Sequence, residues 1–522
     1  MLKKFLNSRF FILYIAPFTI GSLSILSFQP FNFTVINFII FPLLFYLIIY
    51  ITKKSKSTYR KKPYKANLFI FGLSFGFGFY LSGVSWIVNS LTFDESFKIF
   101  IPFGLIFIPL FLSLFVAVPV LLIGPKLKFD FSSLMIFSGC LALSDYLRAK
   151  LFTGFPWNLW AYSTSWINEI IQILNIIGLY AYNLIIITLF TLPIVYFFKI
   201  KAIKKVYCLF LALISISVLY IYGNFSINKN KYFLDTIDEK IFVKIISPNF
   251  ELKYGLSLSQ IEERLKKLIK YSDPNKDKKT LFIWPEGVFS GYSFDEIIVF
   301  KDLIKNNFSN KHIIIFGANK FDNETGNFYN SMFAINNNFE IIQSYDKQKL
   351  VPFGEFLPFE KLFSTLGLKK ITEGSGSYSI GKRSENIIID ELNILPLICY
   401  EIIFTNLVQQ SNHNTNLIIN ISEDGWFGTS TGPEQHFVHS IFRAVESGKY
   451  LLRSANNGIA AIVNPLGIIE QKIEYGQSGY IDFKKAKKIK PTLFSTYGNK
   501  IFIVLILVYI FLIFSFNKFR NE

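Results

Sequence analysis

Eight long apolar runs constrain this chain more than any other feature of its sequence. Each is close to the roughly 20 residues that an α-helix needs to cross the hydrocarbon core of a bilayer. Seven precede a long polar segment and one follows it; they cover residues 9–27, 34–52, 67–92, 99–124, 131–149, 171–198, 203–223 and 499–517. The sequence therefore predicts a polytopic α-helical membrane bundle of about eight spans with one large polar domain.

The pattern of runs divides the chain into three parts. We expect residues 1–225 to form a membrane domain with seven transmembrane helices. Residues 226–495 form the polar domain, and residues 496–522 form the eighth helix and a short tail. The first run lacks a convincing small-residue cleavage site, so we interpret it as a retained helix and not as a signal peptide.

Basic residues occur in alternate connections between the runs. They fall at Lys3, Lys4 and Arg9, in segment 53–65, at Lys126 and Lys128, in segment 199–205, and at Lys518 and Arg520. The intervening connections are poor in Lys and Arg, and connections rich in these residues stay in the cytoplasm. We therefore expect both termini in the cytoplasm and, after seven spans, the polar domain on the outer side of the cytoplasmic membrane.

One connection on the expected outer side is strongly aromatic. Segment 148–166 contains Trp157, Trp160, Tyr162 and Trp166. Such residues are enriched where lipid headgroups meet hydrocarbon, which favours an aromatic belt. A second interpretation is that this segment helps to shape a lipid-facing entrance.

Charge and cysteine content exclude two further possibilities. The formal charge is +18, but many basic residues sit in short clusters between apolar runs, and we find no nucleic-acid-binding motif. We therefore expect no nucleic-acid partner. The polar domain holds Cys399 as its single cysteine, so it cannot form a disulfide within itself.

The polar domain has the pattern of an α/β fold. Short apolar runs rich in β-branched residues recur between about 240 and 490, and several are separated by helix-like stretches such as 257–272 and 434–452. Strands that are apolar almost throughout are typical of sheets covered on both faces. The sequence therefore predicts a layered α/β domain.

Three residues that can carry chemistry lie at the ends of apolar runs or in the connection after one. Glu286 follows the run 280–284, Lys347 lies in a polar connector, and Cys399 directly follows the run 394–398. A thiol nucleophile needs a base to take its proton, and a lysine can stabilise the oxyanion that forms. These residues are consistent with a thiol acyl-transfer site. Chemistry alone favours the plainer interpretation, an ion pair between Glu286 and Lys347 beside an inert, buried Cys399.

The motifs around these residues resemble those of a known family. WPEG at 284–287, K-x-x-L-V-P-F-G-E-F at 347–356 and C-Y-E at 399–401 occur in the order found in the nitrilase superfamily. Further similar stretches are SGVSW at 82–86, TGFPW at 153–157, NISEDGWFG at 420–428, GPEQH at 432–436 and LRSANNG at 452–458. Over essentially its full length, the chain resembles the apolipoprotein N-acyltransferases.

The resemblance implies a nitrilase-like αββα sandwich and a set of site residues. Matched by motif, Glu286 is the general base, Lys347 stabilises the oxyanion and the thiolate, and Cys399 is the nucleophile. Glu355 matches a supporting carboxylate. The remaining expected residues of the substrate pocket are Tyr400, Glu401 and Trp426.

The resemblance also implies the reaction and its location. The family transfers the sn-1 acyl chain of a phospholipid, through a cysteine thioester, to the α-amino group of a diacylglyceryl-modified apolipoprotein. We expect a multi-pass protein of the bacterial inner membrane with a periplasmic catalytic domain, and a monomer. We expect no cofactor and no metal site; His436 and His439 have a spacing that can bind metal, but no cysteine or nearby acid pair completes the set.

Two departures from the family pattern and two alternative functions remain open. Tyr254 stands where a Trp is expected in a shortened loop, and Glu423 and Gly425 vary the pattern around Asp424. A membrane-tethered amidase or nitrilase-type hydrolase would use the same three residues and pass the acyl group to water. A non-catalytic membrane scaffold would need none of them.

Overall fold

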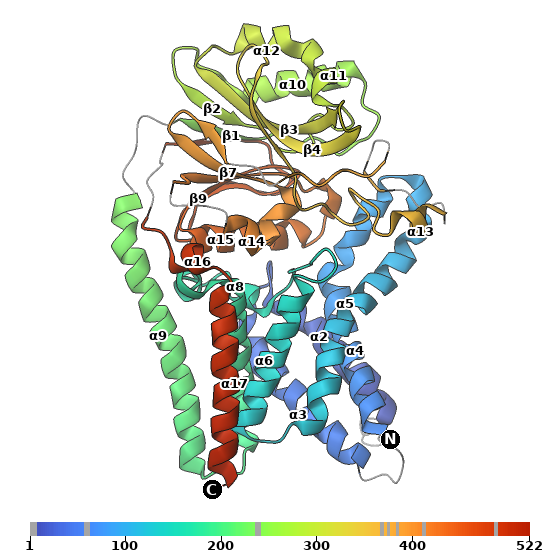
Figure 1. Ribbon diagram of the computed structural model, residues 1–522, viewed down its shortest axis with the longest axis vertical. Helices are drawn as coiled ribbons and strands as arrows, with labels where there is room; N and C mark the ends of the chain where they lie inside the picture. Colours follow the sequence, from blue (N-terminus) through green and yellow to red (C-terminus); the bar gives the residue numbers. More distant parts are fainter. Residues whose placement is uncertain are drawn as a thin grey trace. The chain divides into compact units, whose positions relative to one another are not determined.

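The computed structural model describes residues 8–56, 63–234, 242–365, 370–372, 376–382, 386–409, 414–484 and 489–521 (Figure 1). Contacts between residues divide the chain into two compact units. The first comprises Met1–Val88, Ile99–Phe225 and Tyr497–Glu522, and the second comprises Asn89–Lys98 and Ser226–Thr496. The short segment Asn89–Lys98, between two apolar helices, therefore packs with the large polar unit.

The first unit is a bundle of apolar helices. Its principal helices are α2 (Ala16–Leu23), α3 (Asn37–Lys56), α4 (Pro63–Val84), α5 (Ile101–Ile123), α6 (Phe131–Arg148), α8 (Leu174–Thr191), the first part of α9 (Ala202–Leu234) and α17 (Lys500–Asn521). Glycines permit close helix contacts: a Cβ at Gly21 would lie 2.1 Å from the carbonyl oxygen of Phe75, and one at Gly78 would lie 2.1 Å from that of Phe18. Small residues of this kind allow apolar helices to approach each other closely.

The prediction of about eight spans is approximate. Among the described residues, six helices are long and apolar enough to cross a membrane: Thr34–Ser55, Tyr64–Thr92, Glu95–Lys126, Leu174–Phe197, Ala202–Tyr232 and Lys500–Asn517. The run at 9–27 forms a shorter apolar helical segment, Phe11–Ser27. The run at 131–149 forms α6, which carries Asp145 and Arg148 and several serines.

The two charged residues of α6 organise the aromatic connection that follows it. Arg148 is paired with Asp145 at 3.0 Å, and its Nη1 donates to the carbonyl oxygens of Phe155 (2.6 Å) and Trp157 (2.8 Å). Trp157, Trp160 and Tyr162 are buried within the unit, whereas Trp166 is half exposed. Of the four aromatic residues, the interface-belt interpretation therefore suits Trp166 alone.

The second unit contains two six-stranded sheets. The first has the order β12-β1-β2-β3-β4-β5 and the second β11-β10-β9-β8-β7-β6. The strands of the first are β1 (Val243–Ser247), β2 (Thr280–Ile283), β3 (His312–Asp322), β4 (Asn327–Ile335), β5 (Ile341–Asp346) and β12 (Gly479–Phe483); those of the second are β6 (Ile387–Ile389), β7 (Leu392–Ile398), β8 (Leu417–Glu423), β9 (Tyr450–Asn456), β10 (Ala460–Val463) and β11 (Ile469–Ile473). Strands β1, β2 and β3 are mutually parallel, and so are β7, β8 and β9.

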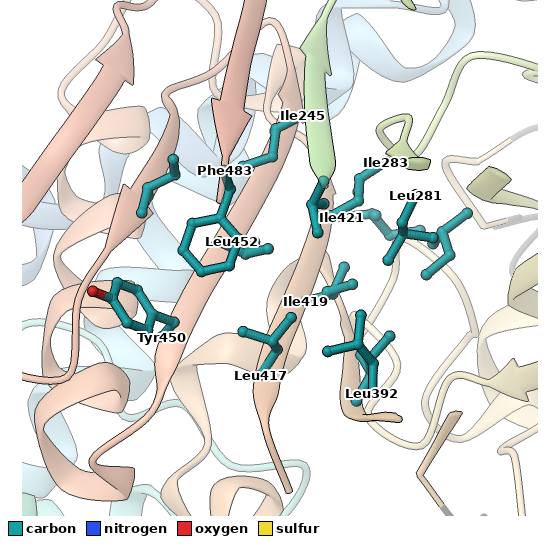
Figure 2. Close-up of a cluster of buried hydrophobic side chains, with 14 of the residues drawn as sticks. Ile245, Leu281, Ile283, Leu392, Leu417, Ile419, Ile421, Tyr450, Leu452 and Phe483 are labelled. Carbon is teal, nitrogen blue, oxygen red and sulfur yellow. The ribbon is translucent and has the colours of Figure 1, made fainter. Parts of the chain in front are cut away.

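The core lies between the two sheets, and helices cover their outer faces. Figure 2 shows Ile245, Leu281 and Ile283 of the first sheet in one cluster with Leu417, Ile419, Ile421 and Leu452 of the second. The alternate residues Ile246 and Phe282 pack instead with α10 (Leu258–Ser272), while α15 (Gly432–Ser447) packs on β9 and β10. Burial on both faces explains why these strands are apolar almost throughout. The predicted αββα layering is confirmed.

The topology brings several strand ends to one edge of the domain. Strand β5 is antiparallel to β4, which is antiparallel to β3, so β5 runs in the same direction as β2 and β3. Parallel strands end at the same edge of a sheet. The residues that follow β2 and β5 in one sheet, and β7 and β8 in the other, are those that the sequence singled out.

Candidate active site

Side-chain alternation directs the strand-end residues into the space between the sheets. Met332 and Ala334 of β4, Tyr345 of β5 and Ile421 of β8 all belong to the inter-sheet core. Side chains two positions apart on a strand share a face. Asn330 shares the face of Met332, and the same rule extends β5 to Lys347 and β8 to Glu423, so this core ends in a polar site.

Lys347 lies at the centre of the site and is almost completely buried, with its side chain 1% exposed. Its Nζ is 2.8 Å from Glu355 Oε1 and 3.5 Å from Glu286 Oε1. Burial alone would lower the pKa of Lys347, but the charges of Glu286 and Glu355 outweigh burial and raise it. The ammonium form is therefore held in place at neutral pH.

Glu286 and Glu355 are fixed by further hydrogen bonds. Glu286 Oε1 accepts from Asn330 Nδ2 at 2.8 Å, and Glu286 Oε2 accepts from the backbone N–H of Glu423 at 3.1 Å. Glu355 Oε1 accepts from the same Asn330 Nδ2 at 2.7 Å, and its Oε2 accepts from the backbone N–H of Val351 at 2.8 Å. Both carboxylates thus have defined orientations around Lys347.

Cys399 begins the short turn that follows β7. Its φ of +48° is in the left-handed region, which a residue with a Cβ adopts only under strain. The thiol Sγ is 4.0 Å from the carbonyl oxygen of Glu423. Burial raises the pKa of Cys399, the charge of Glu286 raises it further, and the charge of Lys347 opposes both. The resting form is the thiol, so a role as nucleophile would need a base that removes its proton.

Glu401 joins the cysteine turn to the lysine segment and is fully buried. Its Oε2 accepts from the backbone N–H of Ile398 at 2.8 Å. Its Oε1 accepts from Tyr345 Oη (2.9 Å) and from the backbone N–H groups of Gln348 (2.7 Å) and Lys349 (3.1 Å). Burial raises the pKa of Glu401 to about 7, although the hydrogen bonds oppose this shift. The structure therefore places Glu401 between the segment that carries Lys347 and the segment that carries Cys399.

The other expected pocket residues are aromatic and lie near the site. Tyr400 is buried against Phe404, with ring centroids 5.1 Å apart and an edge-on orientation. Trp426 is half buried, and its ring lies 5.4 Å from that of Phe93 and 6.0 Å from that of Tyr254. The segment Asn89–Lys98 thus contributes Phe93 to this aromatic group.

The two departures from the family pattern both make defined contacts. Tyr254 Oη donates to the carbonyl oxygen of Ile371 at 3.1 Å, a bond that requires the hydroxyl. The carboxylate of Glu423 accepts from Asn456 Nδ2 (2.6 Å), Asn457 Nδ2 (3.1 Å) and the backbone N–H of Gly425 (2.8 Å). Burial raises the pKa of Glu423 to about 8.

A buried charged cluster lies directly after β8, next to Glu423. Asp424 accepts from Arg453 Nη2 at 2.7 Å, and its Oδ1 is 3.0 Å from His436 Nδ1. Burial alone would raise the pKa of Asp424, but Arg453 and then His436 hold it well below its usual range. His436, considered as a metal ligand from its spacing with His439, thus lies beside an ion pair. Across the described ranges, no group of three or more His, Cys, Asp and Glu side chains could hold a metal ion.

Asn330 is the site residue that sequence reasoning missed. Its two side-chain contacts link Glu286 and Glu355, which are distant in the chain. The only signal in the sequence is that Asn330 is one of three polar residues in the strand NFYNSMFAI. That signal does not reveal its partners, because the pairing of β4 with β3 and β5 is needed to place it.

Comparison with known proteins agrees with this geometry at two levels. The family model described as "Carbon-nitrogen hydrolase" matches residues 254–482, which places the second unit in that class of domain. The model described as "Apolipoprotein N-acyltransferase N-terminal domain" matches residues 20–192. The two matches do not overlap in the sequence.

Full-length relatives identify the family. Apolipoprotein N-acyltransferase of Rickettsia bellii is 36% identical over 459 residues, covering 85% of this chain and 87% of that protein. The protein of the same name from Rickettsia typhi is 34% identical over 490 residues, covering 92% of this chain and 94% of its own length. The chain belongs to the apolipoprotein N-acyltransferase family.

A solved structure is similar to the second unit only at a low level. The yeast Nit3 protein, a nitrilase-superfamily member from Saccharomyces cerevisiae, is 19% identical and covers 48% of this chain and 91% of that chain, with a TM-score of 0.36. The family assignment does not depend on this similarity.

The electrostatic coupling of Cys399 predicts opposite effects of two substitutions on its reactivity. In a Cys140→Ala/Cys208→Ala background, iodoacetamide should alkylate Cys399 slowly at neutral pH. The rate should keep rising above a pH of about 8.5, the pKa of a free cysteine, because the pKa of Cys399 is higher. Glu286→Gln removes a charge that raises the pKa of Cys399, so alkylation should become faster at a given pH. Lys347→Met removes a charge that lowers this pKa, so alkylation should become slower.

The rate of alkylation is measured by mass spectrometry of the peptide that contains Cys399 across a pH series. Cys399→Ala in the same background is the control for labelling elsewhere. Equal rates in all three proteins, or shifts in the same direction for both substitutions, would contradict the coupling that the geometry implies.

Proposed function

We propose that this protein transfers the sn-1 acyl chain of a phospholipid to the α-amino group of the N-terminal diacylglyceryl-cysteine of apolipoproteins. The observation that carries the proposal is the convergence of Glu286, Lys347 and the strained Cys399 at one domain edge, in a chain of this family. The proposed roles are base for Glu286, electrostatic stabiliser for Lys347 and nucleophile for Cys399. Glu355, Glu401, Tyr400 and Trp426 support them.

In the first step, Cys399 Sγ attacks the carbonyl carbon of the sn-1 ester while Glu286 accepts the thiol proton. The tetrahedral intermediate carries a negative charge on the former carbonyl oxygen, which the ammonium of Lys347 stabilises. The bond from this carbon to the glycerol oxygen then breaks. Glu286 returns the proton to that oxygen, a lysophospholipid leaves, and a thioester remains on Cys399.

In the second step, the amine of the apolipoprotein attacks the thioester carbon. Glu286 accepts a proton from the attacking nitrogen, and the bond from carbon to sulfur breaks. The leaving sulfur receives the proton from Glu286, so the thiol is regenerated and an amide is formed. In each of the two steps, Glu286 thus accepts one proton and then gives it to the leaving group, which suits a carboxylate close to the thiol.

The resting electrostatics support this sequence of proton transfers. The pKa of Cys399 is raised, chiefly by burial, so the thiol is not consumed by side reactions before a substrate arrives. The pKa of Lys347 is raised despite burial, so its positive charge is available when the oxyanion forms. We propose that Trp426, Phe427 and the half-exposed Phe353 help to keep water from the thioester.

The apolar helices would hold the protein in the membrane, where both proposed substrates are also anchored. The protein is a membrane protein of bacterial type, as its family and its apolar helices indicate. We propose that it lies in the inner membrane as a monomer, with both termini in the cytoplasm and the catalytic unit in the periplasm, because Lys and Arg occur in alternate connections. The match to the N-terminal domain of the family does not favour the amidase or scaffold alternatives.

The acyl transfer is tested with purified protein, a phospholipid with a defined sn-1 chain and a synthetic diacylglyceryl lipopeptide. We predict a lipopeptide mass gain equal to that acyl chain and formation of one lysophospholipid per transfer. Cys399→Ser and Glu286→Gln should each lower the rate by at least about 10³-fold, since residues that act as a unit in covalent catalysis have large effects when removed. Release of free fatty acid with no change in the lipopeptide would indicate a hydrolase instead.

The orientation is tested by labelling introduced cysteines in intact cells with a membrane-impermeant maleimide, after permeabilisation of the outer membrane. All native cysteines are replaced by Ala. We predict labelling of Lys270→Cys, on the exposed face of α10, and no labelling of Lys201→Cys until the inner membrane is disrupted. The reverse pattern would place the catalytic unit in the cytoplasm and contradict the proposed orientation.

A further inference from the structure

Asn330 of β4 contacts the proposed catalytic groups through three separate hydrogen bonds. Its Nδ2 donates to Glu286 Oε1 at 2.8 Å and to Glu355 Oε1 at 2.7 Å. Its backbone carbonyl oxygen accepts from the backbone N–H of Lys347 at 2.9 Å. A single residue of β4, the strand beside the edge strand β5, therefore fixes the lysine segment and both carboxylates that flank the ammonium.

The chemistry of the amide group determines what these contacts can do. An Asn side chain has two N–H donors on one nitrogen, and both are used here. Each is directed at one carboxylate oxygen, so the amide fixes the orientation of both carboxyl groups. Hydrogen bonds of this kind to a carboxylate are short and strong. Asn330 thus limits the rotation of the Glu286 side chain.

The same contacts distinguish the two oxygens of Glu286. Oε1 is occupied by Asn330 and faces Lys347 at 3.5 Å. Oε2 accepts from the backbone N–H of Glu423, whose carbonyl oxygen lies 4.0 Å from Cys399 Sγ. In a strand, the N–H and C=O of one residue point to the same side. Oε2 and the thiol therefore lie against the same backbone unit.

We propose that Asn330 is a positioning residue that holds the side chain of Glu286 with Oε2 directed to the thiol of Cys399. The proposal rests on the assignment of Glu286 as the base. The ionisable groups that face Glu286 are Lys347 after β5, Glu355 in the following loop, Cys399 after β7, Glu423 at the end of β8, and Tyr378. Of these, only Lys347 is cationic, so loss of Asn330 leaves the two carboxylates to share one ammonium.

The test separates positioning from a general effect on the sheet. The variants are Asn330→Ala, the isosteric Asn330→Asp, and the control Ser331→Ala. Ser331 is the next residue on β4; it is buried, faces the opposite side of the strand, and donates to Asp346 Oδ1 at 2.7 Å. The Ser331→Ala variant therefore loses one hydrogen bond on the same strand, and this bond does not involve the proposed catalytic groups.

The reaction is followed as the burst of p-nitrophenol released when p-nitrophenyl butyrate acylates Cys399, in the Cys140→Ala/Cys208→Ala background. We expect Asn330→Ala to lower the acylation rate by roughly 10²-fold, the order expected when a reacting group is misplaced by about 1 Å. Adding Asn330→Ala to Glu286→Gln should lower the rate little further, because the group that Asn330 positions is already absent. Asn330→Asp should also be slow, whereas Ser331→Ala should keep the wild-type rate.

Two outcomes would overturn the proposal. One is an Asn330→Ala substitution that lowers the rate as strongly in Glu286→Gln as in the wild-type protein, and the other is an Asn330→Asp protein with the wild-type rate. The assay does not use a phospholipid, so its result is independent of the natural donor. A wild-type protein that shows the burst but does not accept a phospholipid would contradict the proposed function and leave the role of Asn330 to be decided by the same variants.

Discussion

The buried ammonium of Lys347 is the interaction on which the rest of the site depends. Removing a lysine from water is costly, and the cost is offset only when carboxylates and hydrogen bonds surround it with good geometry. Here Glu355 Oε1 is 2.8 Å and Glu286 Oε1 is 3.5 Å from Nζ. Because this geometry must be kept, the strand ends, the loop that carries Glu355 and the amide of Asn330 are all fixed relative to one another.

The fold supplies that rigidity through two sheets whose inner faces share one core. The apolar inner faces of the strands end at Asn330, Lys347 and Glu423, so the polar site directly adjoins the apolar core. The second sheet contributes Cys399 in a strained backbone conformation, and Glu401 links that turn to the lysine segment through four hydrogen bonds. The proposed nucleophile and its proposed electrostatic partner, from different sheets, are thereby held at fixed positions.

Much of the fold could be predicted from the sequence, because apolar periodicity marks the layers directly. Strands that are apolar almost throughout predict a layered α/β domain, and the resemblance to the family implies the αββα arrangement. The number of spans was only approximate, because α6 combines apolar residues with the paired Asp145 and Arg148. Glu286, Lys347 and Cys399 stood out as polar residues at strand ends. Asn330 and the partners of Glu401 could not be predicted, because they depend on which strands pair and in which register.

The central claim is that Cys399 carries the acyl group, and direct detection of the acyl-enzyme tests it. Purified protein is incubated with a phospholipid of defined sn-1 chain and no acceptor, and the peptide that contains Cys399 is weighed by mass spectrometry. The account predicts a hydroxylamine-labile mass gain equal to that chain, absent in Cys399→Ala. An unmodified Cys399 peptide from a protein that does acylate a lipopeptide would contradict the thioester mechanism.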